Sequence, residues 1–124
     1  MLTSPELLGR LDPAKSTYLQ ALRERVLIFD GAMGTNLQLM GLSPEDFGGP
    51  DLEGCNEILI STRPDLIAAV HRSFYEVGCD VVETGTFGSS PVVLAEYGLA
   101  DRAREISRGG AEIAKAVAAE FSTA

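Results

Sequence analysis

The sequence predicts an α/β fold, in which short apolar strands alternate with amphipathic helices. Residues 26–29 are an apolar run that leads into Asp30 and Gly31, and residues 81–83 form a second run that leads into polar and glycine residues. Such runs are typical of buried parallel strands that end in a tight turn. Helical periodicity between and after the runs indicates the crossovers of a parallel sheet or barrel.

Two short helices are expected in the first third of the chain. Asp12 and Pro13 are suited to the N-cap and the first turn, so we expect an amphipathic helix over residues 13–24, after one helical turn at residues 5–8. In front of a barrel strand, the first of these helices would plug the closed end. Residues 35–40 are expected to form one or two further turns.

The helix between the two apolar runs has clear start and stop signals. Arg63 and Pro64 open it, and Gly78 fits its C-terminal end. Its expected buried face carries Leu66, Ile67, Val70, Phe74 and Val77.

Two helices are expected after the second run. Ser90 and a proline open a brief one, and Asp101 is expected to cap a longer one over about residues 102–120. Two glycines at residues 109–110 should weaken the longer helix by about 1 kcal/mol each relative to alanine. The expected buried residues of this helix are Ile106, Ile113, Val117 and Phe121.

Composition limits the class of protein. The chain has 124 residues, which favours one domain, and a net charge of -8, which disfavours nucleic acid and anionic membranes as partners. It shows neither a membrane span nor a signal peptide, and its two cysteines make no disulfide framework, so a cytoplasmic location is expected. Because an eight-stranded barrel needs about 250 residues, we expect the chain to be the front part of something larger.

The predicted strand ends carry the candidate site. Ligands of α/β proteins bind at the carboxyl ends of parallel strands, so Asp30 and Thr86 are candidates. Asp30 is also explained as a turn residue, and Glu83 as a structural acid paired inside the barrel, which we favour. The loop over residues 42–57 follows the first turn and is expected to be functional.

Other chemistries fit the sequence less well. His71, Cys55 and Cys79 match no common zinc spacing, so we expect a hydrogen-bonded structural histidine, a loop thiol without a basic neighbour and a small buried cysteine. The glycines after Asp30 lack the lysine and spacing of a phosphate loop. The acids of residues 45–53 lack the order of a calcium loop, so a solvated loop is expected.

Six short motifs follow one another in order: Asp30-Gly31-Ala32-Met33-Gly34-Thr35, Gly54-Cys55-Asn56-Glu57-Ile58-Leu59, Arg63-Pro64-Asp65, Val70-His71-Arg72-Ser73-Phe74, Gly78-Cys79-Asp80-Val81-Val82-Glu83-Thr84 and Thr86-Phe87-Gly88. Together they resemble the homocysteine S-methyltransferase family over about residues 25–121. Residues 46–47, 51–54 and 95–99 are most similar to the cobalamin-dependent members of that family.

This resemblance implies a (β/α)8 TIM barrel. Residues 1–24 would be a leader and capping helix, and residues 25–124 a partial homocysteine-binding barrel with about two βα units. The implied reaction transfers a methyl group to the thiol of homocysteine to give methionine, with a zinc ion that removes the thiol proton. The implied partners are homocysteine and the folate and cobalamin modules of the full-length enzyme.

The resemblance also implies roles for single residues. Asp30 and Gly31 would contact the substrate, and Thr86 and Phe87 would line its pocket. The family's zinc cysteines lie on later strands, so we expect no zinc ligand and no methyltransferase activity in these 124 residues alone. Gly85 stands where the family usually has asparagine, which removes one amide contact.

Two alternatives stay open. The methyl donor would be betaine or S-methylmethionine in other members of the family. From a different class, the chain would be a non-catalytic α/β fragment that associates with itself along open sheet edges.

Overall fold

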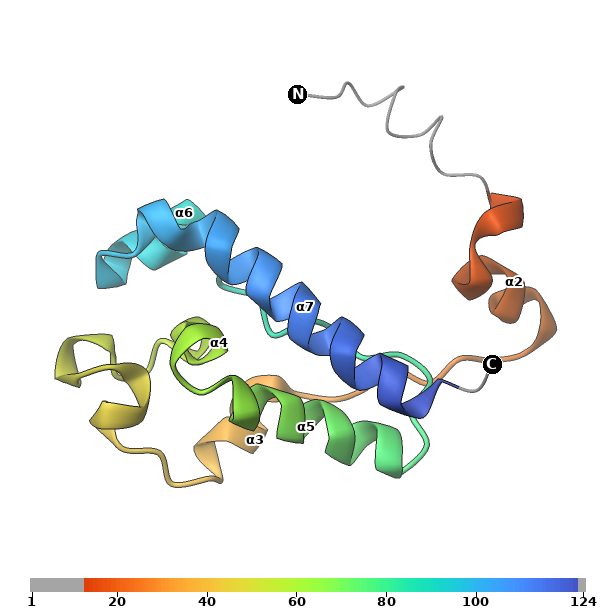
Figure 1. Cartoon of the computed structure of the whole chain (residues 1–124), viewed down its shortest axis with the longest axis horizontal. Helices are drawn as coiled ribbons and strands as arrows, with labels where there is room; N and C mark the ends of the chain where they lie inside the picture. Colours follow the sequence, from red (N-terminus) through yellow and green to blue (C-terminus); the bar gives the residue numbers. More distant parts are fainter. Residues whose placement is uncertain (1–12, 123–124) are drawn as a thin grey trace, which may run out of the picture.

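The computed structural model describes residues 13–122, which are mostly helical. Helices α5 (Pro64–Glu76) and α7 (Ala103–Phe121) pack together along the body of the molecule, and α2 stands apart at one end (Figure 1). The other helices and 3₁₀ turns are η1 (Pro13–Lys15), α2 (Thr17–Glu24), α3 (Met33–Gln38), η2 (Pro44–Phe47), η3 (Pro50–Leu52), η4 (Asn56–Ile58), α4 (Leu59–Thr62), α6 (Pro91–Leu94), η5 (Ala95–Tyr97) and η6 (Ala100–Arg102).

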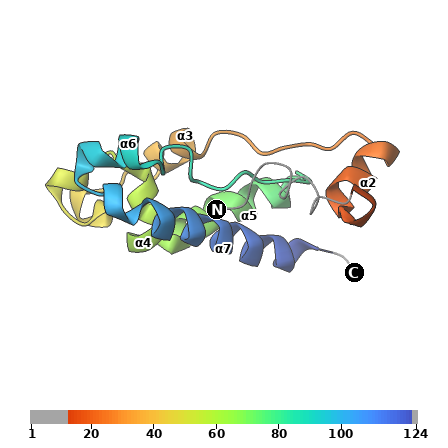
Figure 2. The same ribbon diagram turned by 90° about the horizontal axis from the view of Figure 1, so that it is seen from above.

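The two apolar runs are extended segments that lie on one side of the α5–α7 pair (Figure 2). Within residues 13–122 they form one parallel bridge, between Phe29 and Val81, so the predicted strands are wrong in extent but right in pairing and direction. One cause is the Asp80 carboxylate, which accepts the Ile28 N–H at 2.9 Å and so occupies a donor that would continue the pairing.

The predicted burial of the first run is also wrong. Val26 is 84% exposed and Ile28 is 58% exposed. A segment paired along one edge alone leaves its faces open unless other elements cover them. Within the described residues, the packing that covers this run is partial: Tyr18 of α2 meets the ring of Phe29 edge-on, with ring centroids 6.3 Å apart.

The start of α2 differs from the prediction. A 3₁₀ turn occupies residues 13–15, and the Ser16 side chain then caps α2 by accepting the Leu19 N–H at 3.2 Å. The predicted cap, Asp12, and the predicted turn at residues 5–8 lie outside the described residues. Tyr18, Leu19 and Leu22 of α2 are 42%, 37% and 44% exposed, so the apolar face of this helix is only partly packed.

Helix α5 confirms its predicted ends. Pro64 occupies the first turn, and Gly78, at a φ of 102°, closes the helix with its N–H donating to the Tyr75 carbonyl at 3.0 Å. Its buried residues are Ile67, Val70 and His71. Val77 is 80% exposed, contrary to the prediction, because it follows the last helical residue.

The close packing of α7 explains why it contains two adjacent glycines. A Cβ at Gly110 would lie 2.4 Å from Cγ2 of Thr86, and one at Gly109 would lie 2.9 Å from Cγ2 of Ile60. The glycines therefore let α7 approach α4 and the second extended segment closely. The predicted Asp101 cap is wrong: η6 precedes α7, and within residues 13–122 no side chain caps the helix.

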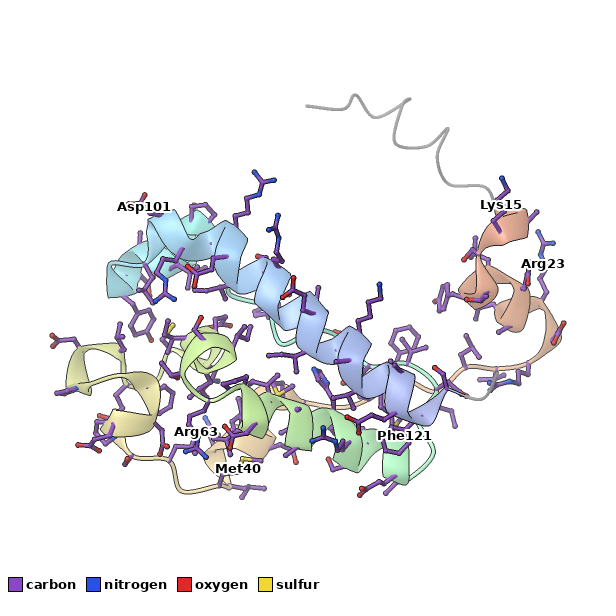
Figure 3. The ribbon with its side chains drawn as sticks, in the orientation of Figure 1. Lys15, Arg23, Met40, Arg63, Asp101 and Phe121 are labelled. Atoms are coloured by element: carbon purple, nitrogen blue, oxygen red, sulfur yellow. The ribbon has the colours of Figure 1, made fainter. Side chains whose placement is uncertain are left out.

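The predicted buried face of α7 is largely confirmed. Ile106 and Val117 are buried and Ile113 is partly buried. Phe121, at the end of α7, is half-exposed and stacks on Tyr75, with ring centroids 5.2 Å apart (Figure 3).

The core lies where α4, α5 and α7 meet the loop over residues 42–57. That loop supplies two buried side chains, Phe47 and Cys55, so it is a packed element. The other buried members of this cluster are Leu37, Ile58, Leu59, Ile60, Ile67, Val70, Leu94, Leu99, Ala103 and Ile106. Within the described range, every helix is too short or too polar to cross a membrane.

Candidate functional site

A pocket of about 410 Å³ lies where the two extended segments end. The turn that opens α3, the turn of η4 and the end of the second extended segment form its walls. Its lining residues are Asp30, Gly31, Ala32, Met33, Gly34, Asn56, Glu57, Glu83, Thr84, Gly85 and Phe87. A larger cleft of about 500 Å³ lies between α4 and α7, but it contains none of the predicted site residues.

Asp30 connects the two extended segments at the pocket. Its N–H donates to the Val81 carbonyl at 3.0 Å, and its Oδ1 accepts the Glu83 N–H at 3.1 Å. The carboxylate is therefore held by the backbone of the second segment and does more than form a turn. Its orientation is fixed in a wall of the pocket, where a carboxylate favours a cationic group.

Gly31 and Gly34 give the first turn its close contacts. A Cβ at Gly31 would lie 3.2 Å from Cζ of Phe74, and one at Gly34 would lie 3.3 Å from Nδ2 of Asn56. These approaches come from side chains of the protein itself. Both glycines line the pocket, where they leave the backbone open to a small ligand.

The second segment divides its residues between two sides. Phe87 lines the pocket and is 105% exposed, but Thr86 is not part of the lining. The Thr86 methyl faces Gly110 of α7, and its hydroxyl lies 2.7 Å from the hydroxyl of Thr84, which does line the pocket. The structure therefore brings Asp30, Gly31 and Phe87 together and leaves Thr86 behind them.

Glu83 and Gly85 also lie in this wall. Glu83, expected as a paired acid inside the barrel, is exposed at the pocket and takes part in none of the ion pairs formed within residues 13–122. A Cβ at Gly85 would meet Cε of Met33 at 3.6 Å, which is an ordinary contact.

Asn56 and Glu57 are pocket residues to which sequence reasoning assigned no role. Oε1 of Glu57 accepts the Gly88 N–H at 2.9 Å, across 31 positions of the chain. The available signal was a polar pair directly after the buried Cys55, within a motif of the family resemblance.

The histidine and the cysteines do not form a metal site. His71 is fully buried as expected, but within the described residues neither ring nitrogen has a hydrogen-bond partner, so the expected hydrogen bond is wrong. Burial lowers the pKa of His71, and the negative charge of Asp30 opposes this shift. Within residues 13–122, no three His, Cys, Asp or Glu side chains are grouped to hold a metal ion.

The two thiols have different surroundings. Cys55 is buried, and burial raises the pKa of its thiol, which disfavours the reactive thiolate. Cys79 is half-buried, less than expected, and its Sγ lies 3.5 Å from the Phe29 carbonyl oxygen.

The acidic loop is held by Asp46. Its carboxylate accepts the Ser43 N–H at 2.9 Å in a capping box and pairs with Arg63, and together these contacts lower the pKa of Asp46. Arg63 also forms two bonds to Asp65, at 3.0 and 2.9 Å, and Figure 3 marks its place beside α5. The loop was expected to be solvated, but Asp46 attaches it to Arg63 at the start of α5.

Comparisons with known proteins agree with the family resemblance of the six sequence motifs. A family model described as homocysteine S-methyltransferase matches residues 27–124. The chain is 50% identical over 105 residues to the methionine synthases of Mycobacterium tuberculosis and Mycobacterium leprae, and 85% of the chain is covered in each case. It spans only 9% and 8% of the lengths of these two relatives.

Proposed function

The chain belongs to the homocysteine S-methyltransferase family, and we propose that its pocket binds the amino-acid end of homocysteine in an enzyme of the methionine synthase type. The enzyme would transfer a methyl group to the homocysteine thiol and release methionine. In this proposal, residues 25–124 form the first two βα units of a (β/α)8 barrel, and the protein is cytoplasmic.

The observation that carries the proposal is the fixed carboxylate of Asp30. It lies at a turn where two parallel segments end, and the Glu83 N–H holds one of its oxygens. A protonated α-amino group is the part of homocysteine that such a carboxylate recognises, because charge-assisted hydrogen bonds are among the stronger polar contacts in proteins. The pocket volume of about 410 Å³ lies in the range of small-molecule sites.

The other pocket residues would orient the substrate. Gly31 would let the ligand approach the backbone of the first turn, and the exposed ring of Phe87 would cover the apolar part of the substrate. Thr86 is outside the pocket lining, and its methyl faces α7, so we propose no substrate contact for it. The carboxylates of Asp30 and Glu83 give the pocket a negative charge that suits an ammonium group.

The described residues do not fit the zinc ion that the family implies. They lack a three-ligand group, and their two cysteines are a buried thiol and a thiol beside a carbonyl. No zinc step is therefore assigned to them. We place the zinc ligands, the cobalamin and the folate module on other polypeptide of the full-length enzyme, and we expect these 124 residues alone to lack methyltransferase activity.

The test is an Asp30→Asn variant of the complete polypeptide that contains these residues. Calorimetry would measure the dissociation constants of L-homocysteine and of 4-mercaptobutanoate, which lacks the amino group. A charged hydrogen bond contributes about 1.5–3 kcal/mol, so the variant should bind homocysteine roughly 10- to 100-fold more weakly and 4-mercaptobutanoate unchanged. Asp51→Asn, an exposed acid outside this pocket, is the matched control. Unchanged homocysteine binding by Asp30→Asn would overturn the proposal.

A second candidate function is self-association. The exposed apolar side chains of Val26 and Ile28 lie beside an incompletely paired segment, which is the kind of edge that recruits another chain. If this candidate is correct, the mass on size exclusion and the melting temperature of the 124-residue chain rise with concentration. A monomer that melts sharply at micromolar concentration would contradict it.

A further inference from the structure

We infer that Glu57 is a positioning residue, which holds Phe87 at the pocket by binding the backbone at Gly88. The inference rests on the proposed function, because its main readout is homocysteine binding. Glu57 belongs to η4, on a different wall of the pocket from Phe87. Its carboxylate therefore connects two loops that are far apart in the sequence.

Phe87 depends on its backbone for its position. The ring is fully exposed, so packing within residues 13–122 does not fix it. Phe87 and Gly88 are the central residues of a turn that the Ser89 N–H closes on the Thr86 carbonyl at 3.0 Å. The remaining Gly88 N–H donates to Oε1 of Glu57 at 2.9 Å. This bond ties the turn to η4, directly beside the exposed ring.

The contact between Glu57 and Gly88 is close enough to require glycine. A Cβ at Gly88 would lie 2.7 Å from Oε1 and 2.9 Å from Cδ of Glu57. The φ of Gly88 is not positive, so glycine serves here to make room for the carboxylate. Residue 88 is buried and Glu57 is partly buried, and a lower local dielectric strengthens a hydrogen bond.

The same turn of η4 reaches the first loop. Nδ2 of Asn56 would lie 3.3 Å from a Cβ at Gly34, so Asn56 packs against the start of α3. Asn56 and Glu57 thus touch both loops whose residues line the pocket. A shift of Glu57 would move Phe87 relative to Asp30, and small displacements of positioning groups are costly to binding and reaction.

Two conservative variants separate reach from charge. Glu57→Gln keeps the length and an acceptor oxygen but loses the charge, whereas Glu57→Asp keeps the charge but is one methylene shorter. In the complete polypeptide, we expect Glu57→Gln to bind homocysteine within about twofold of wild type and Glu57→Asp to bind roughly tenfold more weakly. The reverse pattern would show that Glu57 acts as a charge on the substrate, and it would overturn the inference.

A double-mutant cycle tests whether Glu57 acts through Phe87. If it does, Glu57→Asp weakens binding in the wild-type background and has little further effect beside Phe87→Ala. Fully additive effects, or no effect of Phe87→Ala alone, would refute the mechanism. Glu53→Ala, an exposed acid outside this pocket, is the matched control and should leave the dissociation constant unchanged.

Hydrogen exchange supplies a readout that needs no ligand. The peptide containing Gly88 should exchange faster in Glu57→Asp and at the wild-type rate in Glu57→Gln. Gly88→Ala, which forces the carboxylate away, should show the same faster exchange. It takes the place of Glu57→Asp if that variant folds poorly. Unchanged exchange in both disruptive variants would overturn the inference. If the wild-type protein binds no homocysteine but the variants show the expected exchange rates, the proposed function is rejected. The contact between Glu57 and the Gly88 backbone would still be established.

Discussion

Replacing Gly110 of α7 by alanine tests the close packing beneath the pocket. The new Cβ would lie 2.4 Å from Cγ2 of Thr86 and 3.1 Å from Cδ1 of Ile60. Favourable carbon contacts lie at about 3.5–4.0 Å, so Thr86 would have to move by roughly 1 Å. The movement of Thr86 is restricted, because its N–H donates to the Thr84 carbonyl at 2.8 Å. In addition, the hydroxyl oxygens of Thr84 and Thr86 lie 2.7 Å apart.

Two opposing effects set the magnitude. Alanine in a helix interior is favoured over glycine by about 1 kcal/mol, and overpacking a core costs about 1–3 kcal/mol. Because Thr86 is held by its turn, the upper part of the second range applies, and we expect Gly110→Ala to lower the free energy of unfolding by about 2 kcal/mol. For a domain of this size, that corresponds to a melting temperature roughly 10 °C lower.

Urea denaturation of the variant and the wild type measures this change. Ala116→Gly, at an exposed position of the same helix, calibrates the helix-propensity contribution and should cost about 1 kcal/mol. The reasoning fails if Gly110→Ala is as stable as wild type or more stable. Such a result would mean that α7 and the second extended segment are not in tight contact at Thr86.

Two further outcomes are expected. Burial lowers the pKa of His71 below its usual 6.5, so below that pH the unfolded chain binds more protons than the folded chain. The free energy of unfolding, measured by urea denaturation, should therefore be level above pH 6.5 and fall toward pH 5.5. The variant His71→Gln should remove this decline. Because burial raises the pKa of the Cys55 thiol, iodoacetamide at pH 7.5 should modify Cys55 only after unfolding in urea, as mass spectrometry can check; equal rates in folded and unfolded protein would contradict its burial.

Local signals in the sequence predicted the helix ends best. Arg63, Pro64 and Gly78 bound α5 as expected, because proline fixes the first turn and glycine adopts the closing conformation without strain. The predicted capping acid of α7 was less reliable. Asp101 lies inside a 3₁₀ turn that precedes α7, and an acid is equally at home in a turn and at an N-cap.

The two apolar runs show where sequence reasoning reaches its limit. Hydrophobic periodicity predicts that a segment has a partner, but not which segment covers it. Phe29 and Val81 pair in parallel as expected, yet Ile28 remains exposed within the described part of the chain. Burial of a strand depends on neighbours that are distant in sequence, so it cannot be obtained from the run itself.

The candidate site was predictable in part for the same reason. Asp30, Gly31 and Phe87 follow directly after the apolar runs, and the rule that ligands bind at strand ends places them together. Thr86 departs from the expected lining because α7 takes up its methyl group, which depends on a glycine 24 positions later. Glu57 was missed because its motif suggested no specific contact, and its bond to the second loop spans 31 positions.

Contacts at the start of the paired segments fix their register, and the register places the pocket residues. Asp80 accepts the Ile28 N–H at 2.9 Å, returns its own N–H to the Ile28 carbonyl at 2.8 Å, and binds Arg25 at 2.7 Å. This reciprocal bond fixes the register of the two segments. A slip of one residue would turn alternate side chains to the opposite face, so the Asp30 carboxylate would no longer meet the Glu83 N–H. The alignment of Asp30 in the pocket wall is thus set by contacts two positions before Asp30 and three positions before Glu83.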